Sequence, residues 1–269
     1  MLGRHPYRSS DEILEEMWYR YQPETLPLLN EEELIHSILK KDESGLLQTL
    51  LESTLQQVKS TSTSKEVTET VNKTNEDIQK VSQISTGEQK LLQSYVLQKL
   101  AKIHGTQAEN ITAVRMKEQL IPEERKTIEV DENYYQLELF VSPSYSYKII
   151  GRIDRIEHNH INGESVLIEI KNRLNRLFYK VKEYEYIQIQ IYLFLTGLQH
   201  AKLEEQLNDE IHMIDIPRNQ SYIDHVIFPE LMEFVHRLDN ILSSPSARTE
   251  YLNRKQLMDV SISTSSSDF

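Results

Sequence analysis

The sequence predicts an α/β fold in which a mixed central sheet is flanked by helices and carries an N-terminal helical extension. Apolar residues recur at helical spacing over most of residues 10–58 and again over 86–105. Short β-branched runs bounded by turn residues follow between 111 and 171. A further helical stretch at 183–198 separates these runs from later strand-like segments, which is the alternation typical of an α/β sheet.

Length and composition restrict the class of protein. The chain has 269 residues, a formal net charge of −12 and no cysteine. This length can bury one substantial core with an appended region. The lack of cysteine excludes disulfides, Cys-ligated metals and iron–sulfur clusters. Because no apolar run is long enough to cross a membrane and the N-terminus lacks a signal-like core, we expect a soluble, intracellular protein of the cytoplasm or nucleus, with no membrane partner.

Composition also predicts the domain organisation. Residues 1–58 are expected to form an acidic helical region in which Trp18 and the leucines mainly pack in a core. Residues 59–85 are rich in Ser and Thr and are predicted to be a linker or mobile loop. The main domain is placed at 86–245, followed by a partly disordered tail at 246–269. The acidic N-terminal helices and the tail are the candidate docking regions for a protein partner, and the oligomeric state is left open.

Each element of the main domain has its own signal. The helix that begins at Thr86 is expected to end at Gly105, because glycine is favoured just past a helix C-terminus. Turn residues then separate three expected strands, at 111–121, 126–130 and 134–141. After the helix at 183–198, late strands and a closing helix are expected at 211–216, 222–228 and 229–242.

The central stretch is a predicted hairpin with a carboxylate in each strand. The run 148–156 contains Asp154, and the run 166–171 contains Glu169 and Lys171. Glu169 and Lys171 are two residues apart and therefore point to one face of the strand. If the two runs pair, Asp154 lies beside Glu169 with the lysine at their edge.

Such a cluster needs a chemical reason, because adjacent carboxylates repel and lose hydration when they are partly buried. Mg²⁺ or Mn²⁺ removes the conflict, since these cations prefer oxygen ligands and are held by one or two carboxylates. Phosphodiester hydrolysis is the reaction that fits best. Lys171 would hold or help deprotonate a water and offset developing charge. The alternative is an edge hairpin whose Asp, Glu and Lys form solvated cross-strand pairs.

These residues resemble the PD-(D/E)XK nuclease superfamily, specifically its RecB-like and lambda-exonuclease-type branch. Asp154, Glu169 and Lys171 fall on the D…(D/E)-x-K pattern, and Gly151-Arg-Ile-Asp154 looks like the G-x-x-D form of that branch. Ile153 stands where the family name has proline. The resemblance implies a restriction-endonuclease-like αβββαβ core over residues 86–216.

The resemblance also implies roles for residues outside the hairpin. The segment from Glu185 to Tyr192 is similar to the Q-x-x-x-Y helix of these nucleases, so Gln188 and Tyr192 would orient the scissile phosphate or the lysine and complete the catalytic set. Glu88, in the first turn of its helix, is the candidate third carboxylate. Ile170 joins the expected metal ligands, together with the two acids of the hairpin.

The acidic net charge of −12 argues against a strongly basic nucleic-acid binder, but the distribution of charge weakens this objection. Residues 146–182 hold eight basic and four acidic side chains, a local net charge of +4. Screening over about 8 Å at physiological salt prevents a distant acidic region from cancelling a basic groove. Arg152, Arg173, Arg176 and Lys180 are the predicted nucleic-acid-binding residues.

The sequence thus predicts a metal-dependent deoxyribonuclease that acts on DNA ends or single-stranded flaps in replication, repair or recombination. Exonuclease and endonuclease activity are not distinguished. Two alternatives stay open: a nuclease-like fold that binds nucleic acid or a protein without cutting, and an RNA endonuclease, which shares the E-x-K core but usually adds a histidine ligand.

Overall fold

The computed structural model describes residues 9–26, 31–42, 44–59, 63–119 and 126–265. Its internal contacts divide the chain into two compact units. Unit 1 comprises Met1–Leu28, Gln136–Ile150 and Asn219–Phe269, and unit 2 comprises Leu29–Tyr135 and Gly151–Arg218. These units do not follow the linear division predicted from the sequence, because each unit is assembled from segments that are distant along the chain.

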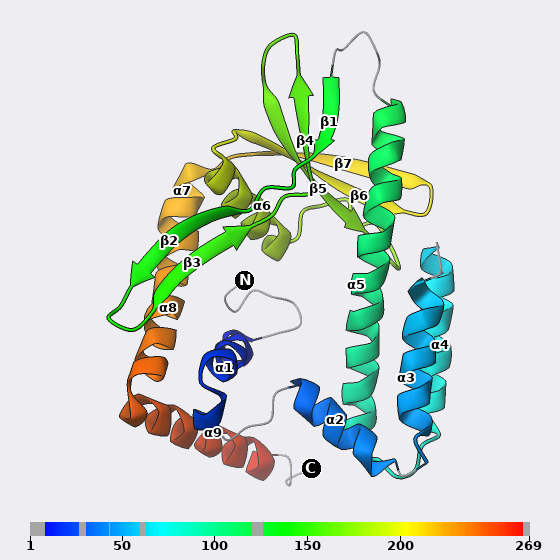
Figure 1. The fold of residues 1–269 in the computed structure, drawn as a ribbon, viewed down its shortest axis with the longest axis vertical. Coiled ribbons are helices and arrows are strands. Elements are labelled where there is room, and N and C mark those ends of the chain that lie inside the picture. Colours follow the sequence, from blue (N-terminus) through cyan, green and yellow to red (C-terminus); the bar gives the residue numbers. More distant parts are fainter. Residues whose placement is uncertain (1–8, 27–30, 43, 60–62, 120–125, 266–269) are drawn as a thin grey trace. The chain divides into compact units, whose positions relative to one another are not determined.

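Unit 2 contains a five-stranded mixed sheet in the order β1-β4-β5-β6-β7 (Figure 1). Its strands are β1 (Lys126–Val130), β4 (Arg155–Asn159), β5 (Ser165–Asn172), β6 (His200–Leu207) and β7 (Glu210–Pro217). Only the pair β5–β6 is parallel. A parallel pair requires a crossover connection, and helix α6 (Glu183–Thr196) supplies it.

The two faces of β5 have different functions. Leu167 packs with Ile189 and Leu193 of α6, so α6 covers the face on which Glu169 and Lys171 also lie. Ile168 and Ile170 point to the other face and cluster with Ile128 of β1. The apolar residues thus fix the strand and leave one polar pair on the face beneath α6.

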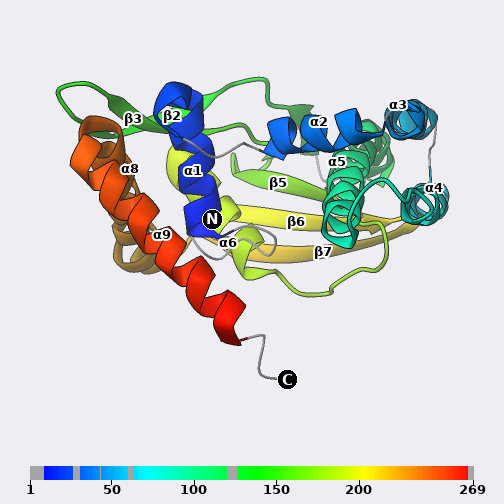
Figure 2. The ribbon, with the colours of Figure 1, turned by 90° about the horizontal axis from the view of Figure 1, so that it is seen from below.

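Four helices form the other part of unit 2. They are α2 (Glu31–Lys41), α3 (Leu46–Lys59), α4 (Ser64–Gln79) and α5 (Thr86–Gln119). Helices α3 and α4 lie beside α5 (Figures 1 and 2) and share with it a core of fully buried aliphatic side chains. This core includes Leu47, Val67 and Leu92.

Helix α4 corrects the predicted linker. Thr63 caps the helix and forms a capping box with Glu66, and Val67, Val71 and Ile78 are buried. The buried Thr74 bonds Thr54 of α3 at 3.1 Å. Small threonines pack well at a close helix–helix contact, so a composition typical of a linker concealed an amphipathic helix.

Helix α5 corrects a second prediction, because it continues through Gly105 to Gln119 where a helix end and a strand at 111–121 were expected. A glycine inside a helix costs only about 1 kcal/mol, which the rest of a long helix offsets. The strand β6, in contrast, was missed, because its charged residues do not follow a strand-like apolar pattern.

Unit 1 combines helix α1 (Ser10–Tyr21) with the hairpin of β2 (Tyr135–Val141) and β3 (Ser146–Gly151), of which residues 136–150 belong to this unit. The other described elements of unit 1 are helical: a 3-10 turn (Pro23–Thr25), α7 (Gln220–Tyr222), a π-helical turn (Ile223–Ile227), α8 (Phe228–Ser243) and α9 (Pro245–Ser265). The expected strand at 222–228 is therefore helical.

Helix α9 occupies most of the segment that was predicted as a partly disordered tail. Tyr251 is buried against Trp18 of α1, with ring centroids 6.1 Å apart, and its hydroxyl donates to Glu15 at 2.8 Å. Residues 266–269, the end of that predicted tail, lie outside the described residues. In the part of the chain that the structure describes, no helix has the length and apolar character needed to span a membrane.

Glu204 of β6 is a buried carboxylate with no hydrogen-bond partner among the described residues. It stands opposite Ile170 in the parallel register, hence on the apolar face of the sheet. Burial raises the pKa of its carboxyl from the ordinary 4.5 to about 7.

Glu204→Gln is expected to stabilise the fold at pH 8. The folded state holds the Glu204 proton up to about pH 7. The wild type therefore loses stability as the pH rises from about 4.5 to 7 and stays at the lower level above that window. The shift corresponds to about 3 kcal/mol in the free energy of unfolding, which the neutral amide should recover at pH 8 and not at pH 5. Urea unfolding at both pH values checks this; an equal difference at the two would refute the assignment.

Candidate active site

Asp154 lies in the break between β3 and β4, at the edge of β5. Its Oδ2 accepts a hydrogen bond from the main-chain N–H of Ile170 at 2.8 Å, and the Glu169 carboxyl is within hydrogen-bond reach. The register of β4 and β5 explains the meeting. Arg155 stands opposite Ile168. Asp154, the residue before Arg155, therefore lies beside the N–H of Ile170, the next N–H that β5 presents at the edge facing β4. The structure therefore brings the two predicted acids together.

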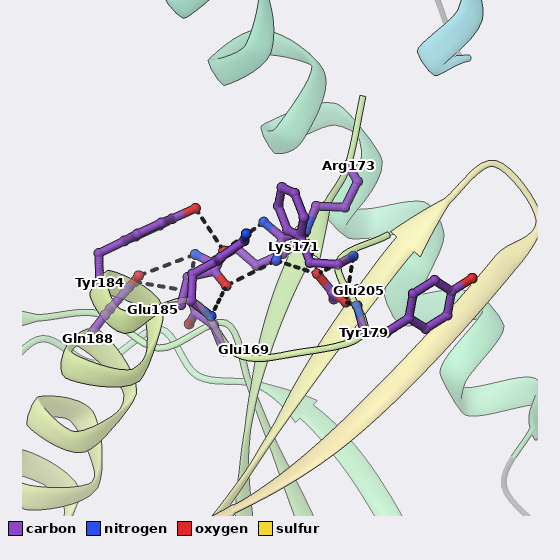
Figure 3. A network of polar contacts seen from close by, with 10 residues as sticks. Glu169, Lys171, Arg173, Tyr179, Tyr184, Glu185, Gln188 and Glu205 are labelled. Atoms are coloured by element: carbon purple, nitrogen blue, oxygen red, sulfur yellow. Dashed lines mark hydrogen bonds and ion pairs between the residues drawn. The ribbon is translucent and has the colours of Figure 1, made fainter. Parts of the chain in front are cut away.

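Lys171 and α6 complete the cluster (Figure 3). Lys171 Nζ donates to Glu169 Oε1 at 2.5 Å and to Gln188 Oε1 at 3.3 Å. Gln188 Nε2 donates to the same Glu169 oxygen at 2.9 Å and to the hydroxyl of Tyr192, one helical turn on, at 3.0 Å. One amide thus holds the lysine, the acid and the tyrosine at the same time.

The cluster is electrostatically strained in a way that a cation would relieve. Burial raises the pKa of Asp154, against the opposing effects of the Ile170 N–H and the Lys171 charge. Burial alone would lower the pKa of Lys171, but the charge and hydrogen bond of Glu169 outweigh it, so the net shift is upward and the amine is an ammonium. The cluster therefore contains one amine that stays protonated, Lys171, and two adjacent carboxyls. One of these carboxyls, Asp154, ionises less readily than an ordinary aspartate.

A third oxygen ligand is available from the main chain. Within a strand, the N–H and C=O of one residue project to the same edge. The N–H of Ile170 points to Asp154, so its carbonyl projects to that edge as well. Two carboxylates and a carbonyl fit the oxygen preference of Mg²⁺ or Mn²⁺, with waters completing the shell. No group of three or more His, Cys, Asp or Glu that could hold a metal occurs among the described residues.

Glu88 is not part of this cluster. Its carboxylate pairs with Lys41 Nζ at 2.5 Å and accepts from the N–H and hydroxyl of Ser85 at 2.8 and 2.9 Å. These contacts, led by the Lys41 bond, lower its pKa to about 2. A carboxylate in the first turn of a helix satisfies the free N–H groups there. The prediction that Glu88 ligates the metal is corrected accordingly.

The predicted nucleic-acid-binding residues separate into two kinds. Arg152, Arg176 and Lys180 are exposed, and Arg152 lies over the ring of Tyr134 at 5.8 Å. Arg173, in contrast, has a side chain only 10% exposed and is ion-paired on both sides by glutamates. The prediction that Arg173 contacts phosphate was therefore wrong, because sequence charge does not distinguish a surface arginine from a buried one.

Gly151 permits the approach of α6 to the site. A Cβ at this position would lie 2.9 Å from Tyr192 Cε1 and 3.0 Å from Leu195 Cδ1. Gly151→Ala is expected to push Tyr192 and its turn of α6 away from Glu169. Overpacking of this kind costs about 1–3 kcal/mol in the free energy of unfolding, and the DNA cleavage expected from the sequence should fall about tenfold or more in the folded variant. Thermal unfolding and a cleavage assay check this; wild-type values for both would show that the contact is not tight.

The chain is similar to several solved structures at low sequence identity. A search of curated proteins gave no match. Among solved structures, the chain is similar to SSO0001, with 24% identity and a TM-score of 0.35 over 52% of this chain and 66% of that one, just under two thirds of its length. It is similar to the alkaline exonuclease LHK-Exo from Laribacter hongkongensis, with 21% identity and a TM-score of 0.37 over 59% and 75%. For LHK-Exo in complex with dAMP the values are 19% and 0.38 over 68% and 91%.

The match to a family model covers more of the chain than the matches to solved structures do. The model of the PD-(D/E)XK nuclease superfamily matches residues 30–257, which is most of the chain. The mixed sheet flanked by helices agrees with the predicted restriction-endonuclease-like fold. The chain belongs to the PD-(D/E)XK nuclease superfamily.

Proposed function

We propose that this protein is a Mg²⁺- or Mn²⁺-dependent deoxyribonuclease. The supporting observation is the meeting of Asp154, Glu169 and Lys171, with Gln188 bonded to both members of the E-x-K pair. A surface hairpin with solvated cross-strand pairs would not bury these groups or cover them with a helix. A cluster that costs desolvation energy is expected where function requires it.

Each side chain has a defined task in this proposal. A bound cation would polarise the phosphodiester and lower the pKa of a water. Asp154, Glu169 and the Ile170 carbonyl would hold it. Lys171 places a positive charge where negative charge develops on the phosphoryl oxygens. Gln188 fixes the ammonium against Glu169, so that no reorganisation is needed during the reaction.

DNA is preferred over RNA as the substrate because the G-x-x-D and Q-x-x-x-Y patterns resemble the RecB-like branch. The RNA alternative expects a histidine ligand on a helix. His104 of α5 is buried, burial lowers its pKa, and it belongs to no metal-binding group in the described residues. By the same resemblance, DNA ends or flaps in replication, repair or recombination are the proposed targets.

The test is incubation of the purified chain with end-labelled single-stranded DNA, double-stranded DNA and RNA, with Mg²⁺, with Mn²⁺ and with a chelator. Metal-dependent cleavage of DNA is the expected result, and the labelled products distinguish cleavage at ends from internal cleavage. Cleavage of RNA alone would favour the ribonuclease. No cleavage of any substrate, with binding retained, would favour a nuclease-like binding module.

Arg176 and Lys180 are proposed to contact backbone phosphates, as exposed cations on the connector between β5 and α6. Arg176→Gln with Lys180→Gln is expected to weaken DNA binding and to reduce the slope of log K against log salt by roughly one to two. Titration of labelled DNA at several salt concentrations measures this. Arg237→Gln, in an ion pair with Asp11 in unit 1, is the matched control. An unchanged slope in the double variant would remove the connector from the DNA-binding surface.

A further inference from the structure

Arg173 follows Lys171 by two residues and leads into the connector between β5 and α6. Its main chain is held in place: the N–H donates to Gln206 of β6 at 2.7 Å, and the carbonyl accepts from the Ser64 hydroxyl of α4 at 2.9 Å. The position of the Cα is therefore fixed by the sheet and by α4. The side chain then connects this point to α6.

The guanidinium joins α6 to β6. It makes two hydrogen bonds with Glu185 of α6, at 2.6 and 3.1 Å, and reaches Glu205 of β6 through Nε at 2.8 Å and through Nη2 at 2.6 Å. Both glutamate side chains are fully buried. Three groups removed from water in this way are stable only when they satisfy one another, and the planar fork of arginine suits two carboxylates at once.

Each glutamate also anchors its own part of the chain. Glu185 accepts from the N–H of Lys182 at 3.3 Å and so caps the start of α6. Glu205 accepts from the N–H groups of Phe178 and Tyr179 in the connector, at 3.2 and 2.9 Å. We call Arg173, Glu185 and Glu205 the clamp (Figure 3).

The clamp lies one turn of α6 from Gln188, which bonds Glu169 and Lys171 in the candidate active site. Glu185 precedes Gln188 by three residues on α6, so a shift at Glu185 moves Gln188. Gln188 meets Lys171 at 3.3 Å, close to the limit of a hydrogen bond, and a displacement of a few tenths of an ångström breaks that contact.

We propose that Arg173 is a positioning residue: by bridging Glu185 and Glu205 it sets α6 at the place where Gln188 bonds both Glu169 and Lys171. This inference rests on the proposed nuclease function. It gives Arg173 no contact with substrate, in contrast to Arg176 and Lys180 of the same connector.

The test compares Arg173→Lys with the wild-type chain. Lysine keeps the charge but lacks the fork that reaches both glutamates. DNA affinity should stay within about twofold, whereas kcat should fall about 10- to 100-fold, because Gln188 is misplaced and the substrate is not. Glu185→Gln, which breaks the same bridge from the other side, should give the same split and serves if the lysine variant does not fold. Lys202→Met, which removes an ion pair with Glu157 in the same sheet, is the control and should leave kcat unchanged.

Two further readouts separate positioning from general destabilisation. In a Gln188→Ala background, Arg173→Lys should lower kcat by less than about twofold more, because the lost contact is already absent. The side-chain amide signal of Gln188 in a ¹⁵N–¹H spectrum, assigned by its loss in Gln188→Ala, should move in Arg173→Lys and stay in Lys202→Met.

Three results would overturn the inference: weaker DNA binding with an unchanged kcat, effects of Arg173→Lys and Gln188→Ala that multiply, or a Gln188 signal that stays in place in Arg173→Lys. The spectrum needs no cleavage. A wild-type chain that cuts no substrate would therefore refute the nuclease proposal, while the Gln188 signal still decides whether Arg173 positions α6.

Discussion

Lys171→Ala is expected to lower metal-dependent DNA cleavage by about 10³-fold or more while the protein stays folded and binds DNA. The ammonium donates to Glu169 and offsets the charge of the two acids, and preorganised charge of this kind carries much of a barrier reduction. Its side chain is largely covered, so little substrate affinity depends on it. Single-turnover cleavage and a binding titration measure the two quantities separately.

Lys171→Arg distinguishes the two tasks that a lysine can perform at this position. Arginine keeps a positive charge but does not give up a proton near neutral pH. Partial retention of cleavage is the expected result, because Lys171 is an ammonium and its charge can stabilise the transition state. Complete loss would indicate that the lysine must first give up its proton and then take one from the attacking water. Cleavage at the wild-type rate by Lys171→Ala would reject both tasks.

Asp154→Asn is expected to abolish cleavage and, in the absence of metal, to stabilise the fold. The amide still accepts the Ile170 N–H, but it carries no charge to desolvate. Because the folded-state pKa of Asp154 is raised, the wild type is less stable above that pKa than below its ordinary value, so the advantage of the variant should be largest at pH 8 and shrink on acidification.

Metal reverses this order of stability. Mg²⁺ or Mn²⁺ that binds only the folded wild type should raise its Tm in proportion to occupancy, with no effect on Asp154→Asn. Thermal unfolding of both proteins at several metal concentrations provides the measurement. Equal stabilisation of the two by metal would show that Asp154 is not a ligand.

The placement of the reactive residues was predictable because it depends on local rules. Alternation along β5 puts Glu169 and Lys171 on one face, and the turn before β5 returns the chain so that Asp154 meets its edge. The helical repeat puts Gln188 and Tyr192 on one side of α6. Each of these relations spans few residues and needs no knowledge of the rest of the fold.

The predictions from the sequence failed where the structure depends on contacts with residues that are distant along the chain. Val67 and Ile78 make α4 a helix only because α3 and α5 supply a core for them. The same applies to β6, whose Glu205 is tolerated in a buried position because Arg173 and two main-chain N–H groups meet it. A sequence pattern shows the charge of Arg173 but not the two buried glutamates that bind it.

The most direct measurement is a crystal structure of the wild-type chain soaked in Mn²⁺, with anomalous data to locate the metal. We expect an anomalous peak in contact with the carboxylates of Asp154 and Glu169 and beside the carbonyl of Ile170, and no such peak in Asp154→Asn. A peak at another site, or no peak at Mn²⁺ concentrations that support cleavage, would contradict the assignment of Asp154 and Glu169 as metal ligands.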